Sequence, residues 1–211
     1  EENGYVAGSA YENGQIVESI GGGLCQVSTT LYNAVLYAEL EVTQRASHSM
    51  SVSYVDPSRD AMIAEGISDF KFVNNYDTPI LIEGYIDSNN QLGFYIYGKD
   101  TRDAEHSVEF ESETLETTEY TTKYVEDTEA EIGSQETEGA GMDGSTARLW
   151  KVTYENGEEV SREVINNSTY QTSDVTVKVG TKSDNAEATK LVREAITTQD
   201  EGKITEAISK A

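Results

Sequence analysis

The sequence has a single cysteine, Cys25, so the chain cannot form a disulfide within itself. Proline is nearly absent, with two residues, and tryptophan occurs once. Tyrosine, by contrast, occurs 13 times, and a sequence rich in tyrosine and threonine favours strands over helices. No apolar run approaches the roughly 20 residues that a membrane-spanning helix needs, so we expect no transmembrane segment in this chain.

Basic residues are also scarce. Lys and Arg total 15 against 39 Asp and Glu, which gives a formal net charge of -24 and an isoelectric point near 4.2. Such a chain repels the phosphates of nucleic acids and anionic membrane surfaces, so we expect neither as a partner. The chain begins with Glu1 and has no signal-peptide pattern, so we expect a mature or excised fragment that starts partway into a domain.

The first hundred residues combine one helix with several short strands. Glu-Asn-Gly triplets at residues 2–4 and 12–14 predict turns, with a short strand over residues 5–7 between them. Apolar residues at helical spacing predict a helix over residues 26–40. Extended segments are then predicted over residues 49–55, 61–64, 70–73, 79–86 and 92–97.

The second half is dominated by strand patterns. Residues 101–140 alternate acidic and apolar side chains, which is typical of long, solvent-exposed strands. A hairpin is predicted at Glu155-Asn156-Gly157, and a last strand over residues 175–179 is expected to end at Gly180. Two short helical stretches follow, broken at Gly202. We therefore predict an α+β fold: an N-terminal domain with one main helix packed on an antiparallel sheet, then an extended all-β module and a short C-terminal helical tail.

The cysteine occupies the most informative place in the chain. Cys25 directly follows Gly21-Gly22-Gly23, where a loop is predicted to become a helix, and His48 lies one helix length later. Backbone N–H groups at a helix N-terminus acidify a thiol, and an imidazole within reach can take its proton. One hypothesis makes Cys25 the nucleophile, His48 the base and Asp60 the residue that orients His48, with Gln26 or the glycine-loop N–H groups stabilising an oxyanion. The alternative is a cysteine that packs the helix on a sheet, with His48 bonded to the backbone.

The motif around Cys25 is long and continues well beyond it. It reads Gly21-Gly22-Gly23-Leu24-Cys25-Gln26-Val27-Ser28-Thr29-Thr30-Leu31-Tyr32-Asn33-Ala34, followed by His48-Ser49, Tyr54-Val55, Arg59-Asp60-Ala61 and Phe70-Lys71-Phe72-Val73-Asn74-Asn75. Through these residues the first part of the chain resembles the VanW family. The resemblance covers residues 1–99, and we expect the domain itself to cover residues 1–100. That family is named after a gene of vancomycin-resistance clusters and has no established biochemical role. Glu39 departs from the family pattern, which has glycine before Leu40.

Residues 103–182 resemble the G5 domain, a β-rich module named for five glycines. The pattern is carried by Gly133, Gly141, Gly144, Gly157 and Gly180. We expect these glycines to lie in turns that need positive φ angles. The resemblance implies a place among bacterial surface proteins and cell-wall enzymes, with a role in binding N-acetylglucosamine or as a spacer. Residues 183–211 are then expected to form a helical tail or linker.

Carbohydrate-binding residues and metal ligands can also be sought by residue type. Trp150 and Tyr154, with further tyrosines such as Tyr170, have rings that can stack on sugars, although thin sheets also use such rings simply to cover a face. No metal is expected, because Cys25, His48 and the distant His106 lack the spacing of metal ligands, and no cofactor is expected either.

Taken together, the sequence predicts a secreted or surface-anchored bacterial protein that acts at the cell wall. Its acidity and its scarcity of cysteine are typical of bacterial surface proteins. The favoured role is binding or structural, with peptidoglycan or another cell-wall glycan as the partner. The alternative is a cysteine-dependent peptidoglycan hydrolase or amide transferase that uses Cys25 and His48.

Overall fold

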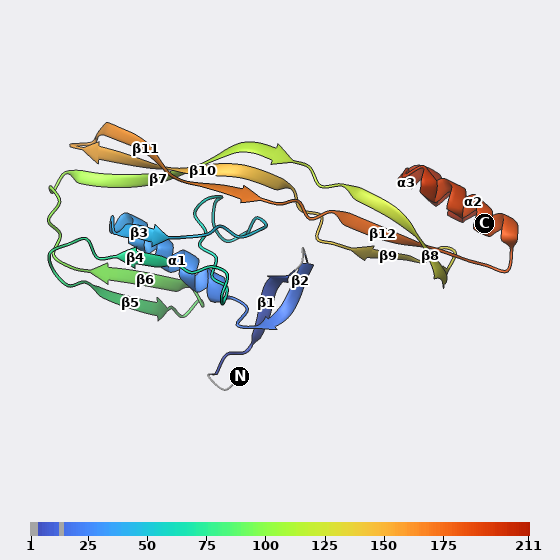
Figure 1. Cartoon of the computed structure of the whole chain (residues 1–211), viewed down its shortest axis with the longest axis horizontal. Helices are drawn as coiled ribbons and strands as arrows, with labels where there is room; N and C mark the ends of the chain where they lie inside the picture. Colours follow the sequence, from blue (N-terminus) through green and yellow to red (C-terminus); the bar gives the residue numbers. More distant parts are fainter. Residues whose placement is uncertain (1–3, 13–14) are drawn as a thin grey trace. The chain divides into compact units, whose positions relative to one another are not determined.

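The computed structural model describes residues 4–12 and 15–211, which hold three α-helices and strands in several short sheets (Figure 1). These residues form two compact units. Unit 1 comprises the described residues up to Glu12, together with Ile16–Thr118 and Gly144–Gln171. Unit 2 comprises Gln15, Glu119–Asp143 and Thr172–Ala211. The predicted α+β class is confirmed, with a helix packed on sheets, an extended β module and short C-terminal helices.

The main helix of unit 1 is α1, Leu24–Tyr37, close to the predicted range of 26–40. Its buried residues recur at helical spacing, and Tyr32 and Leu36 share a core with Phe110 and Leu149 from the sheet described below. The helix ends because Glu39 adopts a φ of 51°, a left-handed conformation that α-helices commonly use to stop.

Three two-stranded sheets accompany α1 in unit 1. They pair β1 (Ala7–Glu12) with β2 (Gln15–Ile20), β3 (Glu41–Gln44) with β4 (Lys71–Val73), and β5 (Leu81–Ile86) with β6 (Leu92–Tyr97). The predicted strand over residues 5–7 thus starts only at Ala7. Of the two Glu-Asn-Gly triplets, residues 2–3 and 13–14 lie outside the described residues.

The strand predicted over residues 49–55 is wrong, and of residues 61–64 only Ala64 forms a bridge, with Ser68. Side chains make hydrogen bonds between the residues that flank this segment. Arg45 Nε donates to the carbonyl of Asp60 at 2.6 Å, and the His48 backbone N–H donates to the Asp60 side chain at 2.7 Å. Alternating apolar residues therefore occur over residues 49–55 without a strand, and Asp60 holds the residues that precede them, Arg45 and His48.

The first sheet of the β module belongs to unit 1. It contains β7 (His106–Thr118), β10 (Gly144–Glu155) and β11 (Glu158–Tyr170) in the order β11-β10-β7, all antiparallel. The predicted hairpin joins β10 to β11 through Asn156 and Gly157, both with positive φ. One face of this sheet packs on α1 through Phe110 and Leu149.

The second sheet of the module lies in unit 2. It contains β8 (Thr122–Glu131), β9 (Gln135–Glu138) and β12 (Val175–Lys182), with β12 in the centre, parallel to β8 and antiparallel to β9. Strand β12 continues through Gly180 instead of ending there. A Cβ atom at Gly180 would lie 2.2 Å from the carbonyl oxygen of Glu131, so only glycine fits. Of the five module glycines, Gly133, Gly141 and Gly157 have the expected positive φ, and Gly144 and Gly180 do not.

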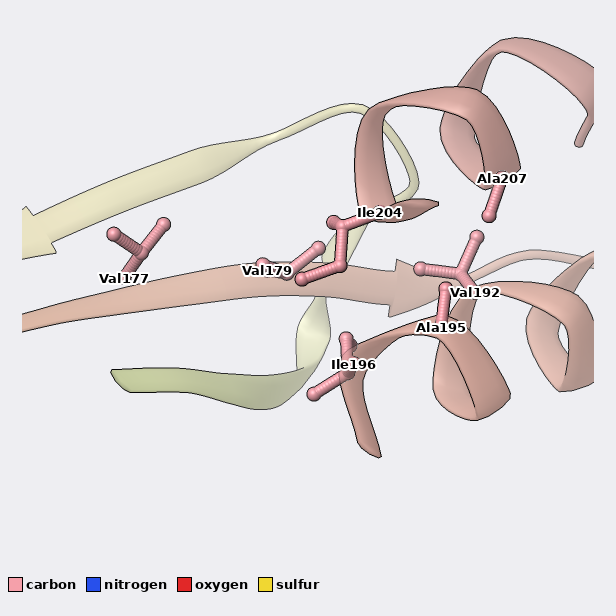
Figure 2. Packing of buried hydrophobic residues seen from close by; sticks show 7 residues of the cluster. All are labelled: Val177, Val179, Val192, Ala195, Ile196, Ile204 and Ala207. Carbon is pink, nitrogen blue, oxygen red and sulfur yellow. The ribbon is translucent and has the colours of Figure 1, made fainter. Parts of the chain in front are cut away.

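The C-terminal residues pack on this second sheet. Helix α2 (Ala186–Thr197) begins at Asn185 and α3 (Glu201–Lys210) begins at Asp200, each with the side chain of that residue accepting backbone N–H groups. The break between the helices is therefore at residues 198–200, and Gly202 lies inside α3. Figure 2 shows how these helices and β12 share a core, which contains Val177, Val179, Val192, Ala195, Ile196, Ile204 and Ala207.

Candidate active site

Asp60 is the centre of the candidate site. Its carboxylate is fully buried and accepts four hydrogen bonds. Oδ2 accepts from the backbone N–H and the ring Nδ1 of His48, both at 2.7 Å. Oδ1 accepts from Arg45 Nη2 at 2.7 Å and from the Tyr170 hydroxyl at 2.6 Å. A buried carboxylate with this many donors remains ionised, because each donor stabilises the charged form.

Two residues of strand β11, Ser168 and Tyr170, form hydrogen bonds with Asp60 or with the residues around it. The Tyr170 hydroxyl, which donates to Asp60, accepts the backbone N–H of Ser58 at 2.7 Å. Ser168 Oγ accepts from Arg45 Nη1 at 2.9 Å and from Ser58 Oγ at 2.9 Å. All these residues belong to unit 1, and Ser168 and Tyr170 are buried. The site is therefore assembled from the His48–Asp60 segment and from a strand more than a hundred residues away.

Cys25 interacts with the same imidazole. Because Asp60 engages Nδ1 of His48, the nitrogen left for the thiol is Nε2. The structure gives Cys25 a hydrogen bond with His48, and the Cys25 Sγ lies 3.4 Å from the carbonyl oxygen of Ile63. The Tyr54 hydroxyl lies 3.4 Å from His48 Nε2. Cysteine, histidine and aspartate are thus aligned as a hydrogen-bonded triad.

The protonation of the triad follows from these contacts. Burial by itself raises the pKa of the Cys25 thiol, but the hydrogen bonds with His48 and with the Ile63 carbonyl, together with the charge of His48, outweigh it, so the pKa is lowered. Burial by itself lowers the pKa of His48, whereas the hydrogen bonds with Asp60 and Cys25 raise it to about 9. Burial likewise raises the pKa of Asp60, and the hydrogen bonds from His48 and Tyr170 lower it below its usual range. The arrangement favours a thiolate beside an imidazolium.

The glycine loop brings Cys25 to the first turn of α1. A Cβ atom at Gly22 would lie 2.2 Å from the backbone carbonyl carbon of Gly8, so the two backbones touch in a way that only glycine allows. Gly23 is the N-cap with a φ of 91°. The N–H groups of Leu24 and Gln26 donate to loop carbonyls, while the N–H of Cys25 has no acceptor among the residues that the structure describes. That N–H is available for a ligand at the thiol.

Gln26 lies next to Cys25 and is exposed. It lines an open groove of about 800 Å³ that also includes Thr29 and Asn33 of α1, and Tyr54 and Arg59 from the segment opposite. Because Tyr54 also contacts His48, this groove adjoins the triad.

The predicted sugar-binding residues lie elsewhere in unit 1. Trp150 and Tyr154 are half-buried on β10, and strand alternation puts Trp150 on the face opposite to the buried Leu149. The indole Nε1 donates to Glu113 at 2.6 Å, and the Arg148 guanidinium stacks 4.6 Å from the indole ring centre. Tyr170 is 3% exposed and donates to Asp60, so its ring is not available to a sugar.

The sequence pointed to Cys25, His48 and Asp60, which the structure brings together, but not to the residues that contact them. Arg45, Ser58 and Ser168 carry no motif signal of their own. Their roles depend on contacts between distant segments.

Within the described residues, no three or more His, Cys, Asp or Glu side chains are grouped to hold a metal ion. The helices among these residues are too short or too polar to cross a membrane.

Two family models match the chain. Residues 1–97 match the model described as VanW like protein, and residues 109–182 match the G5 domain. Both resemblances read from the sequence, over residues 1–99 and 103–182, are thereby confirmed. The G5 match extends over both compact units, since β7, β10 and β11 belong to unit 1 and β8, β9 and β12 to unit 2.

Two curated proteins are similar to part of the chain. "Uncharacterized protein YoaR" of Bacillus subtilis (strain 168) is 51% identical over 79 residues, which is 37% of this chain and 26% of that protein. "Vancomycin B-type resistance protein VanW" of Enterococcus faecalis (strain ATCC 700802 / V583) is 30% identical over 95 residues, 42% of this chain and 34% of that protein. The matched region thus spans about a quarter to a third of these relatives' lengths.

Two solved structures are similar to about a third of the chain. The structure titled "IgA1 Protease G5 domain structure" is 25% identical with a TM-score of 0.29, over 37% of this chain and 94% of that one. "Crystal structure of HP0197-G5" is 10% identical with a TM-score of 0.22, over 36% of this chain and all of that one.

Proposed function

Because the chain contains a VanW-like domain followed by a G5 domain, we propose that it is a cell-wall-associated protein whose Cys25 performs acyl transfer on peptidoglycan amide bonds. The observation that carries this proposal is the alignment of Asp60, His48 and Cys25, in which a buried carboxylate holds the imidazole against the thiol. Both G5 and VanW-like domains, and the acidity of the chain, support a place at the bacterial cell surface.

The reaction begins with attack of the Cys25 thiolate on the amide carbonyl carbon. The carbonyl π electrons move to oxygen, where the free N–H of Cys25 and the side chain of Gln26 can donate hydrogen bonds. The C–N bond then breaks, and the leaving nitrogen takes a proton from the His48 imidazolium. A thioester on Cys25 remains.

The thioester is resolved by water or by an amine. His48, now neutral, takes a proton from the incoming nucleophile, and the C–S bond breaks to return the Cys25 thiolate. Water gives a hydrolase, and an amine gives an amide transferase. Asp60 does not change its protonation, since its four donors hold the carboxylate ionised and His48 fixed through Nδ1.

The pH dependence of thiol alkylation tests the activation of Cys25. We expect iodoacetamide to label Cys25 in the folded protein with an inflection clearly below the pH of about 8.5 at which an ordinary thiol titrates. His48→Gln should move the inflection up to about 8.5 or higher. His106→Gln is the matched control, because His106 is the second of the chain's two histidines and should leave the inflection unchanged. A thiol that reacts only after unfolding refutes the proposal.

Activity is tested on peptidoglycan fragments that contain peptide amide bonds. The expected result is a change in fragment mass, by addition of water or exchange of an amine, that is absent with Cys25→Ala. Products formed equally by Cys25→Ala would come from a contaminant and would contradict the proposal.

The second candidate function is glycan binding by the outer face of the β7–β10–β11 sheet. It is favoured by Trp150, whose ring edge is fixed by Glu113 and whose face is partly covered by Arg148, with Tyr154 on the same face of β10. Aromatic rings flanked by planar charged groups suit sugar rings and hydroxyls. N-acetylglucosamine polymers or intact peptidoglycan would be the ligand.

Pull-down on purified peptidoglycan tests this second function. The intact chain should sediment with the polymer, and Trp150→Ala should reduce the bound fraction, whereas Tyr120→Ala, at an exposed tyrosine of unit 2, should not. If the intact chain stays in the supernatant, or if the two variants reduce the bound fraction equally, glycan binding by this face is contradicted.

A further inference from the structure

Arg59 differs from the other arginines of this acidic protein. The chain has six arginines, and five form ion pairs with carboxylates: Arg45, Arg102, Arg148, Arg162 and Arg193. Arg59 has no such partner within residues 4–12 and 15–211, although Asp and Glu total 39. A guanidinium that no internal carboxylate neutralises can recognise an external anion.

Asn33 and Tyr37 of α1 hold Arg59 in one orientation. Asn33 Nδ2 donates to the Arg59 carbonyl at 2.8 Å, and Arg59 Nε donates to Asn33 Oδ1 at 2.9 Å. The guanidinium carbon lies 5.8 Å from the centre of the Tyr37 ring. A side chain fixed in this way loses little freedom when an anion binds to its outer N–H groups.

The groove beside α1 has the right charge for one anionic group. Its lining contains one cation, Arg59, and one acid, Asp56, and the remaining lining residues are neutral. No ion pair joins Arg59 to Asp56 in the part of the chain that the structure describes. The groove volume of about 800 Å³ is large enough for a short peptide.

The spacing along α1 relates Arg59 to the thiol. Cys25 and Asn33 are eight residues apart on the helix, which corresponds to about 12 Å of axial rise. An extended peptide advances about 3.3–3.6 Å per residue. A group held at Arg59 and a bond placed at Cys25 are therefore separated by about three residues of an extended ligand.

We propose that Arg59 is a subsite for the C-terminal carboxylate of a peptide that lies in this groove. The bound peptide runs along α1, and its carboxylate accepts two parallel hydrogen bonds from the guanidinium. Only the position of the reacting bond rests on the proposed function. An amide about three residues from the peptide's C-terminus lies at Cys25. The site then acts on peptide ends and discriminates against internal segments, which have no free carboxylate.

The test measures binding of N-acetyl-trialanine and of its C-terminal amide, in all-L and all-D forms, to the full chain carrying Cys25→Ala. This variant cannot turn the ligand over. We expect the acid of one form to bind at least tenfold more tightly than its amide. Arg59→Gln should abolish this preference, and Arg59→Lys, which keeps the charge without the planar fork, should retain part of it. Arg148→Gln, at a guanidinium paired with Glu113, is the matched control and should keep the full preference.

Equal binding of acid and amide by the parent protein, or no binding of either, overturns the subsite. So does a folded Arg59→Gln variant that keeps the preference. The comparison of acid with amide and the Arg59→Lys variant remain decisive if Arg59→Gln does not fold. Since binding is measured without the thiol, a failure of Cys25 activation in the alkylation experiment would refute the catalytic proposal and leave the carboxylate subsite standing.

Discussion

The Tyr170 hydroxyl donates a 2.6 Å hydrogen bond to the Asp60 carboxylate across 110 residues of sequence. The same oxygen accepts the backbone N–H of Ser58 at 2.7 Å, so a single phenol bridges a buried charge and a buried amide. Tyr170 is the last residue of β11, in the part of the chain that matches the G5 domain, whereas Asp60 lies in the part that matches the VanW family. The candidate active site therefore depends on both matched regions.

Tyr170→Phe should destabilise the protein. The substitution leaves the Ser58 N–H without its acceptor and removes one donor from buried Asp60, so we expect the free energy of unfolding to fall by about 1–3 kcal/mol. Urea denaturation followed by circular dichroism measures this change. Tyr97→Phe is the control, since the Tyr97 hydroxyl bonds only exposed Glu83 and its loss should have little effect. Equal effects of the two variants would contradict the role of Tyr170.

The stability of a Cys25→Ala variant should depend on His48 at mildly alkaline pH. The folded-state pKa of His48 is raised from 6.5 to about 9, so between these values the folded state binds more protons than the unfolded state. The stabilisation is fully present below pH 6.5 and is lost as the pH rises through about 9. The Cys25→Ala substitution removes the titration of the thiol, which opposes that of His48. It also removes the part of the rise in the His48 pKa that the thiol causes.

Unfolding curves at several pH values measure this dependence. We expect the difference in stability between Cys25→Ala and Cys25→Ala/His48→Gln to decrease by about 1–3 kcal/mol over this range. His106, whose pKa is also raised, by hydrogen bonds with Glu155 and Glu39, is present in both variants and cancels. A difference that stays constant with pH would show that His48 titrates normally.

Gly22→Ala should disrupt the loop that presents Cys25. The added Cβ would lie 2.2 Å from the backbone carbonyl carbon of Gly8. Non-bonded carbon atoms cannot approach so closely, so the loop must move. We expect a loss of stability of about 2 kcal/mol or more and slower alkylation of Cys25 at pH 7. Gly202→Ala, inside α3, is the control and should be neutral or slightly stabilising. Unchanged alkylation in Gly22→Ala would show that the close approach to Gly8 is not needed.

Glu39 combines a left-handed backbone conformation with ion pairs to three basic side chains. Its φ of 51° strains any residue except glycine. Its carboxylate, however, forms ion pairs with Arg102 at 3.0 Å, His106 at 2.8 Å and Lys151 at 2.6 Å. Burial raises the pKa of Glu39, but the hydrogen bonds from these three groups outweigh it and lower the pKa.

Glu39→Gln should therefore be more destabilising than Glu39→Gly. The glutamine keeps the strained backbone and loses the charge, whereas glycine loses the charge and recovers about 0.5–1 kcal/mol of backbone strain. Thermal unfolding at low and high salt provides the measurement, and the salt dependence should be weaker in both variants. The reverse order of stability would show that the backbone strain at residue 39 is negligible.

Local patterns in the sequence were sufficient for the elements that depend on neighbouring residues. Helical spacing predicted α1, Asn-Gly predicted the β10–β11 hairpin, and the glycine run before Cys25 predicted a cysteine in the first helical turn. These features follow from backbone conformation and from the periodicity of side chains along one segment. The same reasoning failed at residues 49–55, where side chains alternate but no strand forms, and where the preceding residue, His48, bonds Asp60.

The sequence by itself singled out Cys25, His48 and Asp60 as candidates for chemistry and predicted the main helix and most of the strands. Only the tertiary structure decided that Asp60 would be buried against Tyr170, that Arg45 would join them, and that Arg59 would be left without an ion pair. The physical reason is that each of these contacts joins segments separated by 15 to 110 residues. Such contacts arise from the packing of α1 on the β7–β10–β11 sheet, and no local period encodes them.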